Sequence, residues 1–173
     1  MKRLNTLFLS AALVTLTAAP ELRAQTTDAP TTGESITIEL TETKDKEINI
    51  GAFAPAGNAW IDINGDGVCQ DNERLGRNST RPEDYTDIFY MGPEIETFTL
   101  DEKTQMVHIY GEIEAIRFEK SYTQTSPISI DLSKATTPKY IRIYECEELT
   151  DVTFPTLEKN NCEVLLIQYT ALQ

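Results

Sequence analysis

The feature that most constrains the fold of this chain is a series of short segments in which every second residue is apolar. Ile36, Ile38 and Leu40 alternate with polar residues, and the same alternation resumes at Ile48 and Ile50. A period of two residues is typical of a β-strand with one buried face. Beyond the apolar N-terminus, no long segment repeats with the 3.6-residue period of an amphipathic helix. The sequence therefore predicts a mainly β protein.

The middle of the chain contains a predicted long loop followed by a predicted hairpin. Residues 74–92 have little apolar periodicity, which indicates a loop. Two apolar segments, Ile95–Leu100 and Met106–Tyr110, flank the polar residues 101–104. Two alternating segments joined by a short polar turn are typical of an antiparallel hairpin, and we expect one here.

The N-terminus has the three-part layout of a secretory signal peptide. Two basic residues precede an apolar run from Leu7 to Ala19, and a short segment then leads to the expected cleavage site after Ala24. The run is shorter than the about 20 apolar residues that a membrane-spanning helix needs, although a membrane anchor is the alternative interpretation. We therefore predict a signal peptide over residues 1–24 and a flexible leader over residues 25–34. The protein is expected to be exported, and to be secreted, periplasmic or on the cell surface.

The charge of the chain argues against two classes of partner. Its 28 acidic and 15 basic residues give a net charge of −13. Such a protein is repelled by the phosphates of nucleic acids and by anionic lipids. We expect neither nucleic-acid binding nor membrane insertion after the signal peptide is removed, whereas an acidic chain does suit cations.

The three cysteines are Cys69, Cys146 and Cys162. In an oxidising compartment they allow one disulfide, whose pairing stays open, and leave one thiol over. No two of them are spaced as C-x-x-C, so the sequence gives no support for a zinc site or a thioredoxin-type redox motif.

One segment carries a specific metal-binding pattern. Residues 62–73 read DINGDGVCQDNE and fit the calcium-loop pattern D-x-[DN]-x-[DN]-G-x5-E without a gap. Calcium prefers roughly six to eight hard oxygen ligands, and the sharp turn of such a loop needs a glycine. The expected ligands are Asp62, Asn64, Asp66, the Val68 carbonyl, Gln70 and Glu73. The alternative is an acidic turn between two strands that holds no metal.

The flanks of this loop differ from those of an EF-hand. Residues 57–61 do not read as a helix, and the sequence contains no second loop of this kind. A single loop on a β scaffold predicts a structural calcium ion rather than a regulated calcium sensor.

The C-terminal third of the chain repeats. Three segments, residues 113–121, 138–146 and 162–172, can be superposed with aliphatic residues in phase. One in-phase set is Ile116, Ile141 and Leu165, separated by steps of 25 and 24 residues. Two further short strands are expected between these segments, over residues 128–132 and 152–154. A period in the twenties is typical of leucine-rich repeats. The alternative is an ordinary β meander.

Several stretches resemble the secreted, internalin-like leucine-rich-repeat surface proteins of bacteria. They are Trp60–Gly67, Ile109–Ile113, Ile130–Lys134 and Leu149–Val152. The resemblance implies a small β-sandwich-like domain over residues 35–111, followed by a short leucine-rich-repeat-like solenoid over residues 112–173. It also implies adhesion or ligand binding rather than catalysis. The chain departs from the family in having only three short repeats and no recognisable C-terminal sorting domain.

No arrangement of catalytic residues stands out in the sequence. The only histidine, His108, falls on the polar phase of a predicted strand and is expected to be a surface residue. We therefore expect a non-enzymatic binding or adhesion protein whose partner is an extracellular protein or a glycan. The alternatives are an accessory carbohydrate-binding module of a secreted hydrolase system, or a shortened relative of longer adhesins.

The exposed face of the repeats is the predicted partner-binding surface. Strand phase places six polar or aromatic side chains on it, namely Arg117, Glu119, Arg142, Tyr144, Gln168 and Tyr169. The last strand, residues 164–169, is expected to be an unprotected edge through which the chain could form a homodimer.

Overall fold

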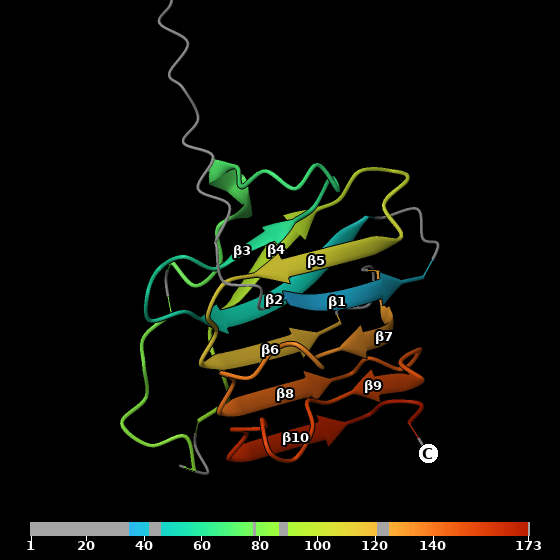
Figure 1. The fold of residues 1–173 in the computed structure, drawn as a ribbon. Coiled ribbons are helices and arrows are strands. Elements are labelled where there is room, and N and C mark those ends of the chain that lie inside the picture. The colour runs from blue at the N-terminus through green and yellow to red at the C-terminus, as the bar shows by residue number, and fades with distance from the viewer. Residues whose placement is uncertain (1–34, 42–45, 78, 87–89, 121–124, 173) are drawn as a thin grey trace, which may run out of the picture.

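The computed structural model describes residues 35–41, 46–77, 79–86, 90–120 and 125–172 and shows a mainly β protein (Figure 1). The predicted signal peptide and leader lie outside the described residues. Within the described ranges, no helix is both long and apolar enough to cross a membrane.

The described residues form ten strands and one short 3-10 helix. In chain order these are β1 (Ser35–Leu40), β2 (Glu47–Phe53), β3 (Trp60–Asp62), η1 (Asp71–Glu73), β4 (Ile95–Thr99), β5 (Met106–Tyr110), β6 (Ala115–Glu119), β7 (Pro127–Asp131), β8 (Tyr140–Tyr144), β9 (Asp151–Thr153) and β10 (Val164–Gln168).

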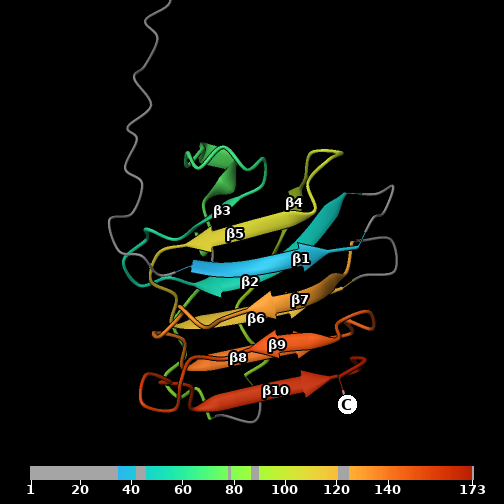
Figure 2. The ribbon, with the colours of Figure 1, turned by 45° about the vertical axis from the view of Figure 1, so that its right-hand side comes forward.

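The strands form two five-stranded sheets that face each other as a β-sandwich (Figures 1 and 2). One sheet has the order β3-β5-β1-β7-β9 and the other has the order β10-β8-β6-β2-β4. The apolar phase of the strands points between the sheets, so that Ile36 and Ile38 of β1 are buried, as are Ile48 and Ile50 of β2. One cluster of buried, mainly aliphatic residues from both sheets forms the core.

Parallel and antiparallel pairs are combined in each sheet. Strands β6, β8 and β10 pair in parallel, as do β7 and β9, whereas β1 and β2 pair antiparallel with their neighbours. The parallel register places Ile116, Ile141 and Leu165 side by side. The recurrence in the sequence therefore corresponds to neighbouring strands of one sheet.

The prediction of a leucine-rich-repeat solenoid over residues 112–173 is wrong. A leucine-rich repeat combines one strand with a helical segment. Here the second segment of each step is a strand, β7 or β9, in the opposite sheet. Both sheets also contain strands from the N-terminal half, so the described residues form a mixed sandwich. The expected boundary at residue 112 falls between β5 and β6, and each sheet takes strands from both sides of it.

The predicted hairpin between residues 95 and 110 is also wrong, although both of its strands exist. Strand β4 pairs with β2, and β5 pairs with β1 and β3 in the other sheet. Phe98 on β4 and Val107 on β5 are both buried in the core that lies between the sheets. The short turn therefore crosses from one sheet to the other instead of folding one strand back on the other.

The connection from β5 to β6 also crosses between the sheets, and it depends on a glycine. Gly111 has a φ of 98°, which L side chains rarely adopt. A Cβ atom at this position would lie 2.7 Å from the carbonyl oxygen of Asn58 and 2.8 Å from the Cα atom of Ala59. The chain can pass this close to the approach of β3 only because residue 111 has no side chain.

We predict that Gly111→Ala destabilises the protein more than Gly57→Ala. Gly57 also has a positive φ, of 62°, but a Cβ atom there would meet nothing within 4 Å. Both variants impose about 1–2 kcal/mol of backbone strain, and the contacts at Gly111 add about 1–3 kcal/mol. Urea unfolding of both variants measures the difference. Equal losses of stability would show that the close approach at Gly111 does not matter.

Candidate functional site: the calcium loop and an aromatic patch

The predicted calcium loop, residues 62–73, joins β3 to η1 at one end of the sandwich (Figure 1). Its two ends are held together, because Trp60 pairs with Arg74 in an isolated bridge and the Leu75 N–H donates a hydrogen bond to the Ala59 carbonyl oxygen at 3.0 Å. Asp62 and Glu73, the first and last residues of the pattern, are 2% and 0% exposed. Two acidic residues are thus buried at the point where the loop closes.

The Asp62 carboxylate organises the first half of the loop. Its Oδ1 accepts hydrogen bonds from the backbone N–H groups of Gly65 (2.7 Å) and Asp66 (3.2 Å), and its Oδ2 accepts one from Gly67 (3.0 Å). Gly65 and Gly67 have φ values of 74° and 71°, which allow the backbone to curl around this carboxylate. The Asp66 carboxylate in turn accepts hydrogen bonds from the backbone of Val68 and from the side chain of Gln70.

The Glu73 carboxylate closes the second half. Its Oε1 accepts a hydrogen bond from the Ile63 N–H (3.2 Å), and its Oε2 accepts one from the Gln70 N–H (2.8 Å). Burial raises the pKa of Glu73, these two hydrogen bonds lower it, and the nearby Asp62 and Asp66 carboxylates raise it again. A cation beside these like charges would relieve their repulsion.

The donor chemistry of the loop fits calcium. The six expected ligands offer only oxygen atoms to a metal, from carboxylates, amides and one backbone carbonyl, and hard oxygen donors suit calcium rather than softer transition metals. The described residues contain no group of three or more His, Cys, Asp or Glu side chains arranged as metal ligands. The carboxylate oxygens point instead to the N–H groups of the loop itself. Calcium binding thus stays a prediction that the donor set supports.

Three of the residues predicted to contact a partner, namely Arg142, Tyr144 and Tyr169, lie together at one end of the β8–β10 pair. The Arg142 guanidinium lies 5.0 Å from the centroid of the Tyr144 ring, and the Tyr144 and Tyr169 rings meet edge to face at 5.5 Å. Tyr169 is 68% exposed and has a φ of 55°, a backbone conformation that bulky residues rarely adopt. We call Tyr144 and Tyr169 the aromatic patch.

The two arginines of the predicted surface are less available than expected. Arg142 is only 6% exposed, and its Nη1 donates a hydrogen bond to the Met91 carbonyl oxygen at 3.0 Å. Arg117, on the neighbouring strand β6, pairs with Glu119. Met91, which precedes β4, therefore covers part of this face, where Tyr85 also packs against Ala115 and Tyr140. The alternation of side chains along a strand could not show that Arg142 is covered.

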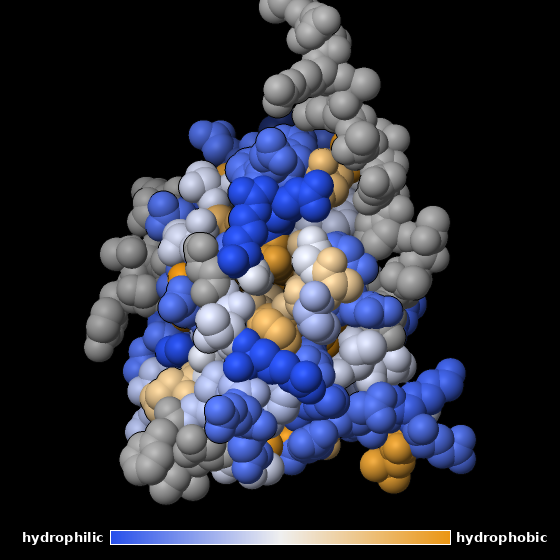
Figure 3. Space-filling model, turned by 90° about the vertical axis from the view of Figure 1, so that its left-hand side faces the viewer, coloured by the Kyte–Doolittle hydropathy of each residue, from blue (hydrophilic) through white to orange (hydrophobic). Residues whose placement is uncertain are grey.

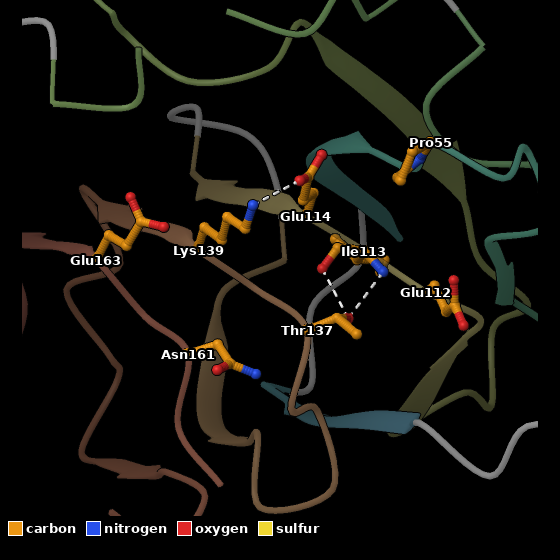
Figure 4. Close-up of a pocket in the computed structure, with 8 residues that line it drawn as sticks. All are labelled: Pro55, Glu112, Ile113, Glu114, Thr137, Lys139, Asn161 and Glu163. Atoms are coloured by element: carbon orange, nitrogen blue, oxygen red, sulfur yellow. Dashed lines mark hydrogen bonds and ion pairs between the residues drawn. The ribbon is translucent and has the colours of Figure 1, made fainter.

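A separate hollow of about 350 Å³ lies where β6, β8 and β10 begin (Figure 4). Figure 3 shows the side of the molecule that faces left in Figure 1, where hydrophobic residues are bordered by strongly hydrophilic ones. Within the hollow, Lys139 Nζ lies 3.0 Å from Glu114 Oε1, which also pairs with Arg81 at 2.9 Å. Its lining residues come from separate loops and lie far apart in the sequence, so no local pattern predicted it. The charge of Glu114 is already balanced without a ligand.

No protein-family model matches this chain, and neither a curated protein nor a solved structure matches it. The resemblance to internalin-like proteins therefore stays a prediction from the sequence.

The remaining reactive side chains lie in ordinary structural positions. His108 is half-buried on β5, with its Nδ1 3.2 Å from Thr37 Oγ1 on β1. Cys69, Cys146 and Cys162 are all free, so the structure forms no disulfide among them. Cys146 is fully buried, and burial raises the pKa of its thiol to about 12.

We predict that alkylation will distinguish the three thiols. Cys69 and Cys162 are partly exposed and should react in the folded protein, whereas Cys146 should react only after unfolding, because the thiolate is the reactive form. Mass spectrometry of peptides labelled before and after urea denaturation measures this. Equal labelling of all three cysteines in the folded protein, or a disulfide-linked peptide, would contradict the prediction.

Proposed function

We propose that this protein is an exported, non-enzymatic binding or adhesion protein whose fold is held at one end by a structural calcium ion. The observation that carries the proposal is the loop of residues 62–73, in which Asp62 and Glu73 are buried and face a third carboxylate, Asp66. Burial of like charges without a counter-ion is unfavourable. A calcium ion held by these residues would neutralise them.

The site suits a structural role better than signalling. The loop starts at β3 and returns at η1, and the Trp60–Arg74 bridge fixes both ends. An ion in this position would hold the end of one sheet together. Outside the cell calcium is plentiful, and sites of about 10⁻⁴–10⁻³ M affinity suffice for such modules.

The aromatic patch is the proposed contact with a partner. Tyrosine is enriched at binding surfaces, because its ring contributes apolar area and its hydroxyl contributes a hydrogen bond. Tyr169 is mostly exposed, whereas Arg142 lies beneath the patch and supports the Tyr144 ring. An extracellular protein or a glycan would fit this surface, and a carbohydrate-binding accessory module is the alternative that exposed tyrosines favour.

We predict that calcium raises the melting temperature of the protein and that Glu73→Gln abolishes the increase. At a calcium concentration about 100 times the Kd, binding adds about 2.7 kcal/mol to the free energy of unfolding. For a chain of this size, that raises the melting temperature by roughly 5–10 °C. The substitution keeps the volume of the side chain but removes its charge. Thermal melts in calcium and in chelator measure the effect.

The matched control for this experiment is Glu102→Gln. Glu102 is exposed in the turn between β4 and β5 and carries the same carboxylate as Glu73, so this variant should keep the full calcium shift. Asp62→Ala should lose the shift and also melt earlier in chelator, because three loop N–H groups lose their acceptor. The calcium proposal fails if the wild-type protein melts at the same temperature in both conditions.

The aromatic patch generates a separate prediction. The double variant Tyr144→Ala/Tyr169→Ala should lose at least about tenfold in affinity for the partner, since two stacking surfaces disappear. Glycan arrays with and without calcium identify a carbohydrate partner, and Met106→Ala, an exposed residue on the other sheet, serves as the control. Unchanged binding by the double variant would remove the patch from the proposal.

A further inference from the structure

The core of the sandwich is progressively less covered toward β10. Along one row of paired residues, Ile116 is 0% exposed, Ile141 is 2% exposed and Leu165 is 45% exposed. In the next row, Phe118 and Ile143 are buried, whereas Ile167 is only partly buried. The side chains of Leu165 and Ile167 point to the same face of the sheet as these buried residues. They therefore lie where the core is incompletely covered.

Strand β10 is also the least protected edge of either sheet. Among the described residues the edge strands are β3, β9, β4 and β10. The first three each contain an acidic residue, namely Asp62, Asp151 and Glu96, and β3 and β9 are only three residues long. Strand β10 has five residues, VLLIQ, and no charge. Charges and short length normally prevent edge strands from pairing with other chains.

The sequence of β10 is complementary to itself. Two copies related by a twofold axis pair antiparallel, and residues opposite each other share a face of the sheet. With the axis at Leu166, Leu165 of one copy lies opposite Ile167 of the other on the inner face, and Val164 lies opposite Gln168 on the outer face. The open end of each core is then covered by the same row of the other copy.

The charges near β10 favour this register over its neighbours. With the axis at Leu166, Glu163 lies opposite Tyr169 of the second copy. Moving the axis to Leu165 would place Glu163 opposite Ile167 on the inner face, where an unpaired carboxylate is unfavourable. Moving it to Ile167 would leave Leu165 opposite Tyr169, whose φ of 55° departs from strand geometry.

We propose that β10 pairs with β10 of a second copy of this chain, antiparallel about Leu166, to form a symmetric dimer with one continuous ten-stranded sheet. This inference does not depend on calcium or on the aromatic patch. Because each copy carries a net charge of −13, association strengthens as salt screens the repulsion between the copies. The dimer presents two aromatic patches on the same sheet, which would allow bivalent binding.

Sedimentation of the purified protein at several concentrations and at low and high salt tests the proposal. The wild-type protein should form dimers that become tighter with salt. Leu166→Lys places two like charges opposite each other at the axis and should be monomeric. Met106→Lys changes an exposed apolar strand residue of the other sheet and should dimerise like the wild type. A monomeric wild type, or dimers that persist in Leu166→Lys, would overturn the proposal.

Cross-linking tests the register and remains decisive if Leu166→Lys does not fold. Leu166→Cys should form a disulfide between the two copies under mild oxidation, because paired strand positions bring the Cα atoms within about 4.5–5.5 Å. Gln168→Cys should not link to itself, since its partner position is Val164. Mass spectrometry identifies the linked peptide among the native thiols. Absence of the link in Leu166→Cys, or equal linking by Gln168→Cys, would rule out this pairing.

Discussion

The structure depends on one shared layer of inward-facing side chains between two sheets. Ile38 on β1 pairs with Val107 and Ile130, and all three are 0% exposed. Ile50 on β2 is equally buried and pairs with Phe118 on β6. Because β1 and β2 each connect N-terminal to C-terminal strands, neither half of the sequence has a core of its own. Loss of one inward side chain at β1 or β2 therefore affects both halves.

The positions of the strands could be predicted from the sequence because the alternation of apolar residues is a local property. The sheet that each strand joins is not local. Phe98 and Val107 have the alternation of a hairpin, yet they belong to opposite sheets. The repeat from Ile116 to Leu165 likewise predicted the spacing of β6, β8 and β10 and the short strands in the segments between them, but not that these segments lie in the opposite sheet. Those segments are strands because they too must cover the core.

The candidate site was likewise predictable only where its residues are close together in the sequence. The pattern of the loop over residues 62–73 can be recognised in the sequence because its twelve residues are contiguous and each position has its own role, and calcium binding there stays a prediction. The aromatic patch could be predicted in part, since strand phase places Tyr144 on the outer face, next to Arg142. That Arg142 is covered by Met91 could not be foreseen, because the two residues are 51 positions apart and only tertiary structure joins them.

The edge strands at the two ends of the sandwich, β3 and β10, differ in length and charge. At one end β3 is short, carries Asp62 and is bridged to Arg74 by the loop that calcium would hold. At the opposite end β10 is longer, uncharged and beside an incompletely covered core (Figure 1). An ion can close an acidic edge, because it neutralises charge. An apolar edge requires an apolar partner, and the self-complementary pattern about Leu166 makes a second copy the simplest one. The proposed calcium site and the proposed dimer contact thus lie at opposite ends, so a change at Glu73 should leave pairing at β10 intact.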